Sequence, residues 1–272
     1  MNNKPSTASE CAYVVREDAP VEAITQSLAA LLPTRHQTIG RHRFTVLDTI
    51  DGRVRRAGAS LTRAGLNGHG TIVWHHPRAA GHLTATVSEP VSFAWDLPTG
   101  PLRRAVADAV GPRRLLEQAD AEEYGTLLDV LDDQRKIVAR VRIASGRARL
   151  PQGRGRWHDL PTVITLTGLR GYEGIYTQLV PVIESRPDVE RCPGGLQAVL
   201  LHQIGAASWP VVSPHVDLSA AAVAHMGARR IHNALLGTLV ANEPGVRDRL
   251  DTEFLHDFRV AVRRTRSIWC QS

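Results

Sequence analysis

Basic side chains line one face of the helix that we expect over residues 252–269. Four of them stand at offsets of 0, 3, 7 and 10, a spacing that stacks side chains in one helical stripe: His256, Arg259, Arg263 and Arg266. Such groups repel one another, so the stripe makes most sense facing a polyanion. Arginine suits phosphate because its planar guanidinium can bind two oxygens at once. The spacing therefore predicts a surface for a phosphate polyanion, against the alternative of a solvated basic face on an ordinary amphipathic helix.

An apolar stripe runs beside the basic one: Leu255, Phe258, Val262 and Trp269. We expect a partner helix over 218–241, a turn at 243–245, and Asp251 or Thr252 as the N-cap of the last helix. Two helices alone cannot bury both apolar stripes. The segment 218–272 is therefore expected to be labile, to form an oligomer through the exposed side of its last helix, or to need a missing C-terminal portion.

The same stretch resembles the opening signature of the CHAD family, helical domains that bind inorganic polyphosphate. The family pattern of His, acid, any, Arg, Val, any two, Arg-Arg, any, Arg, Ser is matched by His256, Asp257, Arg259, Val260, Arg263, Arg264, Arg266 and Ser267. The resemblance implies polyphosphate binding by His256, Arg259, Arg263, Arg264 and Arg266, with Arg229 and His232 from the preceding helix. CHAD domains are much longer than the segment 218–272, which therefore resembles a truncated N-terminal fragment.

The charge balance also indicates an anionic partner. The chain of 272 residues has a net charge of +6, and only Lys4 and Lys136 among its 33 basic residues are lysines. Eight basic residues and no acid fall between 135 and 156. The start of the chain lacks an apolar signal region, there is no apolar run of membrane-spanning length, and the three cysteines form no motif. We expect a cytoplasmic protein without a membrane partner, in association with polyphosphate granules.

The first two thirds of the chain show strand periodicity. Residues 137–143 alternate arginine with apolar side chains, and 71–75, 83–93 and 163–169 are further expected strands. Helical patterns occupy 21–32, 102–110 and much of 173–205. The predicted organisation is a disordered start over 1–9, a strand-rich domain with C-terminal helices over 10–205, a linker over 206–217 and the helical segment 218–272.

The stretch from Phe44 to Gly65 resembles a segment of CYTH domains, which reads Tyr-Asp-Thr-Pro, then Leu, Arg, Ala-Gly, any, Leu-Arg-Arg-Arg. The matching residues are Asp48, Thr49, Arg55, Ala57, Gly58, Leu61 and Arg63. This resemblance implies an antiparallel β-barrel with a polar lumen, the triphosphate tunnel, so the predicted fold class is α+β: a barrel followed by an α-helical hairpin. It also implies tunnel residues that bind phosphate: Glu10, Arg55, Arg63, Arg140 and Arg142.

The departures from the CYTH pattern bear on catalysis. The family's Glu-x-Glu-x-Lys signature survives only as Glu10, since Ala12 and Val14 occupy its other two positions. The late strand at 163–167 has no carboxylate, the lysine expected within 72–76 is absent, and 141–149 is arginine-rich. Triphosphate hydrolysis needs a divalent cation held by oxygen ligands. We therefore predict a pseudoenzyme without a metal site, and we place the acids Asp129, Asp132 and Asp133 on a polar turn.

The favoured hypothesis is a non-enzymatic protein that binds inorganic polyphosphate or another polyanion and needs no cofactor. One alternative is a CYTH-type triphosphatase dependent on Mg²⁺ or Mn²⁺, with Glu10, Arg55 and Arg63 as its residual site. Another is sequence-independent nucleic-acid binding, for which the scarcity of aromatic residues among the basic ones offers few stacking platforms. A zinc site at His69, His75, His76 and His82 is disfavoured because the spacing matches no closed four-ligand set.

Overall fold

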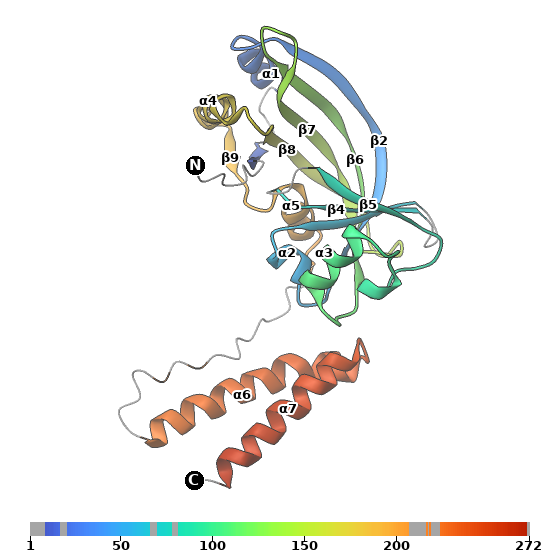
Figure 1. Cartoon of the computed structure of the whole chain (residues 1–272), viewed down its shortest axis with the longest axis vertical. Helices are drawn as coiled ribbons and strands as arrows, with labels where there is room; N and C mark the ends of the chain where they lie inside the picture. The colour runs from blue at the N-terminus through green and yellow to red at the C-terminus, as the bar shows by residue number, and fades with distance from the viewer. Residues whose placement is uncertain are drawn as a thin grey trace.

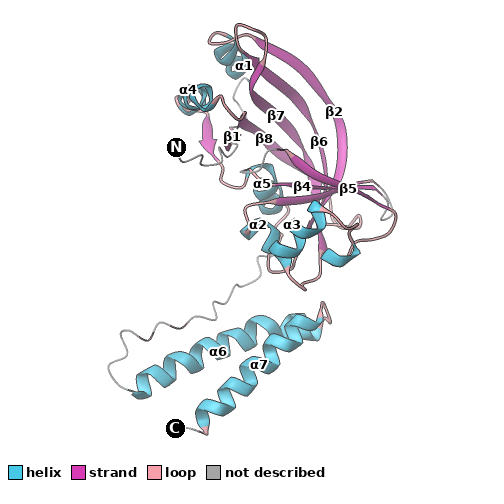
Figure 2. Cartoon of the chain, viewed as in Figure 1, coloured by secondary structure: helices cyan, strands magenta, loops and turns pink. Residues whose placement is uncertain are grey.

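The computed structural model describes residues 9–16, 21–65, 70–77, 81–206, 216, 218 and 224–270. A nine-stranded antiparallel sheet, ordered β5-β4-β3-β2-β6-β7-β8-β1-β9, dominates the first part (Figures 1 and 2). Its strands are β1 Glu10–Val15, β2 Thr34–Asp48, β3 Ser60–Ala64, β4 Gly70–His75, β5 His82–Val87, β6 Leu116–Leu131, β7 Ile137–Arg149, β8 His158–Gly168 and β9 Val189–Arg191.

The helices are α1 Val21–Ala29, α2 Arg53–Arg56, α3 Pro101–Val110, α4 Glu173–Glu184, α5 Gly195–Gln203, α6 Ala224–Arg247 and α7 Thr252–Trp269, with a 3-10 turn, η1, at Ala94–Asp96. A sheet domain followed by a helical hairpin confirms the α+β class. The expected strands within 71–75, 137–143 and 163–169 form, whereas the run 83–93 is a strand only as far as Val87. The predicted disordered start and linker lie almost entirely outside the described residues.

The sheet is not the closed barrel that we expected. Its edges, β5 and β9, do not pair with each other among the described strands. The reason is that β3, β4 and β5 attach to the rest through a short contact, in which Thr45 and Val46 of β2 pair with Arg63 and Thr62. They form a separate wing across the end of the long strands (Figure 1). The wing nevertheless curls back, because Glu10 of β1 contacts His75 of β4.

The two faces of the sheet differ in chemistry. Residues directly opposite each other on paired strands share a face, so the register Glu10–Thr167–Arg140–Asp129–Arg35 runs along one side. We call this side the inner face, since His75 and Glu10 meet across it. The outer face of the long strands packs an apolar core against α1 and α4. Separate apolar cores lie under α3 and under α5.

The hairpin is held by one aromatic residue and one cap. Phe254 is buried between α6 and α7, against Gly245. Asp251 is the N-cap of α7 and accepts hydrogen bonds from the backbone N–H of Glu253 and Phe254, as one of our two alternatives predicted. The turn predicted at 243–245 is wrong, because α6 continues through Pro244 to Arg247. The packing of Phe254 on Gly245 stabilises a helical turn that the local sequence disfavours.

Candidate functional site

The basic residues of the CHAD-like signature are all exposed along α7: His256, Arg259, Arg263, Arg264 and Arg266. Within the described part of the chain none of them forms an ion pair or a side-chain hydrogen bond. The signature's acid, Asp257, is instead engaged by Arg113 of the sheet domain, at 2.8 Å. The result is a set of four exposed arginines and one exposed histidine, with the interspersed carboxylate paired to Arg113, an arrangement that suits a polyanion.

A shallow hollow runs along the same side of α7. Its lining combines cationic, hydroxyl and apolar groups: Thr252, Leu255, His256, Phe258, Arg259, Val260, Val262, Arg263, Arg266, Ser267 and Cys270. Leu255, Val262 and Trp269 are exposed, whereas Phe258 is half-buried. The apolar stripe predicted beside the basic one therefore exists, and the residues that α7 buries are Phe254 and Ala261.

The two candidate residues on α6 are placed differently from each other. Arg229 is exposed. His232 lies between the helices: its Nδ1 donates to the carbonyl oxygen of Ala228 at 2.9 Å, and its ring packs on Trp269 with centroids 5.3 Å apart. The Nε2 of His232 is buried and has no hydrogen-bond partner in the described structure. His232 is thus removed from the exposed stripe.

Three of the five expected tunnel residues do share the inner face: Glu10, Arg140 and Arg142. Each is already engaged. Glu10 accepts from Thr167 at 3.2 Å and contacts His75 Nε2 at 3.0 Å. Arg140 donates to Asp129 at 3.2 Å, and Arg142 pairs with Glu123. The inner face is consequently a network of satisfied charges rather than a set of open phosphate ligands.

Asp129 is the centre of that network. Our prediction that Asp129 lies on a polar turn is wrong. Asp129 lies within β6, is 1% exposed, and accepts hydrogen bonds from Arg35, Gln37 and Arg140. Burial by itself would raise the pKa of Asp129, but the hydrogen bonds from Arg35 and Arg140 outweigh it and lower that pKa. Asp132, in contrast, lies in the β6–β7 turn and accepts from the backbone of Gln134 and Lys136.

The histidines of the wing complete the inner face. His82 lies opposite His75 in the β4–β5 register, and their ring centroids are 4.7 Å apart. Burial lowers the pKa of His82, and the neighbouring His75 lowers it further. His75 also contacts Glu10, so the two histidines and this carboxylate form one cluster on the inner face.

The remaining two tunnel candidates do not reach the inner face. Arg63 lies opposite Thr45, on the outer face, where it pairs with Glu117. Strand alternation places Thr62 and Ala64 inward instead, at the positions where the Leu-Arg-Arg-Arg pattern has its first and third arginine. Arg55 is exposed on α2. The signature therefore keeps the arginine that faces away from the inner face and lacks the two that would face it.

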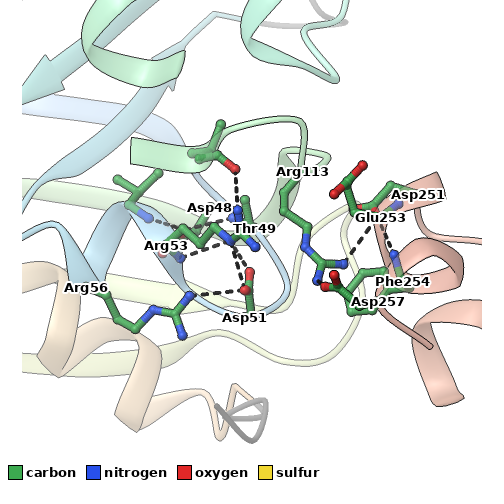
Figure 3. A network of polar contacts seen from close by, with 12 residues as sticks. Asp48, Thr49, Asp51, Arg53, Arg56, Arg113, Asp251, Glu253, Phe254 and Asp257 are labelled. Carbon is green, nitrogen blue, oxygen red and sulfur yellow. Dashed lines mark hydrogen bonds and ion pairs between the residues drawn. The ribbon is translucent and has the colours of Figure 1, made fainter. Parts of the chain in front are cut away.

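The other matched residues of the CYTH-like motif shape a turn. Asp48 accepts from the backbone N–H of Thr49, Val54 and Arg55, and burial raises its pKa despite these bonds. Thr49 accepts from the N–H of Arg53 and donates to Asp51, which also binds Arg53 and Arg56 (Figure 3). These contacts fix α2 at the end of β2, so the surviving motif is structural.

The arrangement does not suit the divalent cation that CYTH enzymes use. Among the described residues no three His, Cys, Asp or Glu side chains come close enough together to hold a metal. The inner-face carboxylates, Glu10, Glu123 and Asp129, are each taken by a histidine or by arginines. Hard cations need several carboxylate oxygens that are free to converge, and this face does not supply them.

Half of the basic run at 135–156 is paired by the neighbouring strand. Four arginines of β7 pair with four acids of β6: Arg140 with Asp129, Arg142 with Glu123, Arg147 with Glu122, and Arg149 with Asp120. Glu122 also binds Arg43 at 2.9 Å, and the hydrogen bonds of Arg43 and Arg147 lower the pKa of Glu122. The four acids between 120 and 129 precede the arginines by one strand, and we missed this hint of a charged hairpin, although the individual pairs depend on register.

Comparison with known proteins supports the C-terminal assignment. Residues 230–270 match the CHAD domain family, which confirms the resemblance for this part of the chain. No curated protein matches the sequence. In addition, none of the described helices is long and apolar enough to span a membrane.

Several solved structures align with most of the chain. One is a candidate adenylyl cyclase from Hippeastrum with a dominant triphosphatase activity, at 12% identity over 73% of this chain and 96% of that one, with a TM-score of 0.42. Candidate adenylate cyclases from Bacillus halodurans (13% identity, 66% and 90% coverage, TM-score 0.36) and Vibrio parahaemolyticus (10%, 75% and 92%, TM-score 0.32) are others. The assignment of the sheet domain rests on its own motif and topology.

Proposed function

We propose that this protein binds inorganic polyphosphate through the exposed face of α7 and does so without catalysis. The observation that carries the proposal is the row formed by exposed His256, Arg259, Arg263 and Arg266, unpaired within the described chain, inside a segment that matches the CHAD family. From His256 to Arg266 the row extends along the helix axis for about 15 Å. A linear polyanion laid along α7 can therefore contact every member of the row at once.

The chemistry of the row favours phosphate over other anions. Arg259, Arg263 and Arg266 offer forked donors that bind two oxygens each, and His256 adds a further donor. Because the groups are exposed, their attraction for a polyanion is screened by salt. The affinity should therefore fall steeply as the salt concentration rises, and it should increase with polyanion length.

The sheet domain is assigned no hydrolytic step. Support comes from its inner face, where the three carboxylates already bind histidine or arginine, and where Thr62, Ala64, Ala12 and Val14 replace the ionisable residues of the CYTH signatures. We infer that its role is to carry α7. The proposed setting is the cytoplasm, in contact with polyphosphate granules.

The direct test is a titration of the full chain with long-chain polyphosphate at two salt concentrations. The triple variant Arg259→Ala, Arg263→Ala, Arg266→Ala should lose at least tenfold in affinity, since each charge-assisted contact is worth about 0.5–1 kcal/mol at an exposed site. The matched control removes three exposed arginines of the sheet domain: Arg104, Arg156 and Arg170. If both triple variants lose the same affinity, the loss reflects net charge alone and α7 is not the binding surface.

Nucleic-acid binding is a second candidate, because the structure does interleave basic and aromatic groups. Arg147 and Arg149 lie over the ring of Trp157, at 4.8 and 4.5 Å from its centroid, and Arg41 lies 5.8 Å from that of the exposed Tyr124. Such groups can stack on the bases of a single strand. Competition separates the candidates: polyphosphate should displace single-stranded RNA at matched charge, whereas the reverse order would favour nucleic acid.

A further inference from the structure

One arginine of the sheet domain reaches into the hairpin. Arg113, in the loop between α3 and β6, is 4% exposed and lies against the N-terminal end of α7 (Figure 3). Its Nη2 donates to Asp257 at 2.8 Å, and its Nη1 contacts Asp251 at 3.3 Å. Its guanidinium carbon also stands 3.8 Å from the centroid of the Phe254 ring. Three consecutive features of α7, namely its cap, its buried aromatic residue and its signature acid, thus converge on one side chain.

The loop that presents Arg113 is itself fixed. Arg53 donates to the carbonyl oxygen of Val110 at 3.0 Å, three residues before Arg113, and Arg53 is held in turn by Asp51. The backbone N–H of Arg114 donates to the other oxygen of Asp251 at 3.1 Å. A charged group held by contacts on both sides is pre-organised, so it can set the position of the element that it binds.

The charge consequence concerns the basic row directly. Asp257 lies on the same two turns of α7 as His256 and Arg259, so an unpaired carboxylate there would add negative charge near the row. We propose that Arg113 is a positioning residue for the polyanion surface: it holds the first turns of α7 and pairs with Asp257, so that the carboxylate within the signature is engaged while its arginines stay free. This inference rests on the function proposed above, and it makes the sheet domain and the hairpin one binding unit.

The test compares two neighbouring charge deletions in the full chain. Arg113→Gln and Arg114→Gln remove the same charge, but the Arg114 side chain is exposed and contributes only its backbone to the contact. Arg113→Gln should weaken polyphosphate binding about tenfold more than Arg114→Gln. Adding Asp257→Asn to Arg113→Gln should restore most of that loss, because the uncovered carboxylate is removed. Asp257→Asn alone should bind at least as tightly as the unmodified chain.

The outcomes separate a positioning role from a structural one. Equal affinities of the two single variants would overturn the proposal, and so would a loss in Arg113→Gln that Asp257→Asn fails to rescue. If Arg113→Gln does not fold, Arg113→Lys serves in its place, since lysine keeps the charge but cannot fork between two carboxylates. Because lysine can still pair with one of the two carboxylates, Arg113→Lys should weaken polyphosphate binding less than tenfold but more than Arg114→Lys, and equal affinities of these two variants would overturn the proposal.

Hydrogen exchange tests the positioning role of Arg113 independently of polyphosphate binding. Amides 252–257 should exchange faster in Arg113→Gln than in Arg114→Gln, with or without polyphosphate. If the unmodified chain does not bind polyphosphate, the proposed function fails, and faster exchange would still establish that Arg113 positions α7. If amides 252–257 exchange at the same rate in both variants, Arg113 does not position α7.

Discussion

The ring of Phe254 lies directly on Gly245: a Cβ at position 245 would stand 2.3 Å from Phe254 Cγ. Because Phe254 is fully buried, it cannot move aside without opening the α6–α7 contact. We expect Gly245→Ala to destabilise the hairpin by about 1–3 kcal/mol, the usual cost of overpacking. Hydrogen exchange of 252–269 measures this effect. Gly174→Ala on α4, where nothing lies within 4 Å of the added carbon, is the control, and equal effects of the two changes would contradict the explanation.

Removing the buried carboxylate of Asp129 should destabilise the sheet in a pH-dependent way. Asp129→Asn leaves Arg35 and Arg140 without their common partner, at a cost of about 1–2 kcal/mol, because both arginines are half-exposed and water replaces part of the interaction. The pKa of Asp129 is lowered in the folded protein, so its stabilising effect is fully present above the unfolded pKa of about 3.9. That effect is lost as the pH falls through the lower folded value. Denaturant unfolding of both proteins at pH 7 and near pH 2 should show the difference shrinking, and a difference that stays constant would refute this assignment.

The chain should not hydrolyse tripolyphosphate. With Mg²⁺ or Mn²⁺ added, phosphate release should remain at the uncatalysed rate, because the inner-face carboxylates are occupied by histidine and arginine. A colorimetric phosphate assay over a range of metal concentrations measures this. Release that depends on metal and disappears in Glu10→Gln would establish the enzyme alternative instead.

The exposed apolar side chains of α7 should make the hairpin the least protected part of the protein. Leu255 and Val262 are at least 40% exposed, and Trp269 is 71% exposed, a patch of the kind that marks an interface. Amides of 252–269 should exchange faster than those of β6 and β7 in the monomer. Light scattering should show association at high concentration that Leu255→Lys with Val262→Lys abolishes. Equal protection of α7 and the strands in a monomer would show that the hairpin is a complete folded unit.

The sequence predicted the elements well because their signals are local. The alternating pattern of 137–143 indicates β7, and the acid at 251 indicates the start of α7. The charge pairs depend on register, which no local pattern gives: the run at 135–156 contains no acid, yet four of its arginines are paired by β6. A charge run in a strand therefore predicts a partner strand as readily as it predicts an anionic ligand.

Other differences arose where tertiary contacts override local preference. Pro244 and Gly245 are typical of a turn, but the packing of Phe254 keeps them helical. The curl of the sheet stops short of closure because β3 pairs with β2 over a short stretch only. Arg113 has no sequence signal at all, since nothing local distinguishes it from the other arginines.

The ladder of arginines and acids between β6 and β7 also limits how this sequence can evolve. Glu122 and Asp129 are almost fully buried, and each binds two or more arginines. A single substitution of either acid therefore leaves several arginines without their partner. Drift at these sites should proceed through paired replacements, with an acid on one strand and a base on the other changing in concert. Covariation between β6 and β7 positions would therefore be expected among descendants of this chain, even if phosphate binding were lost.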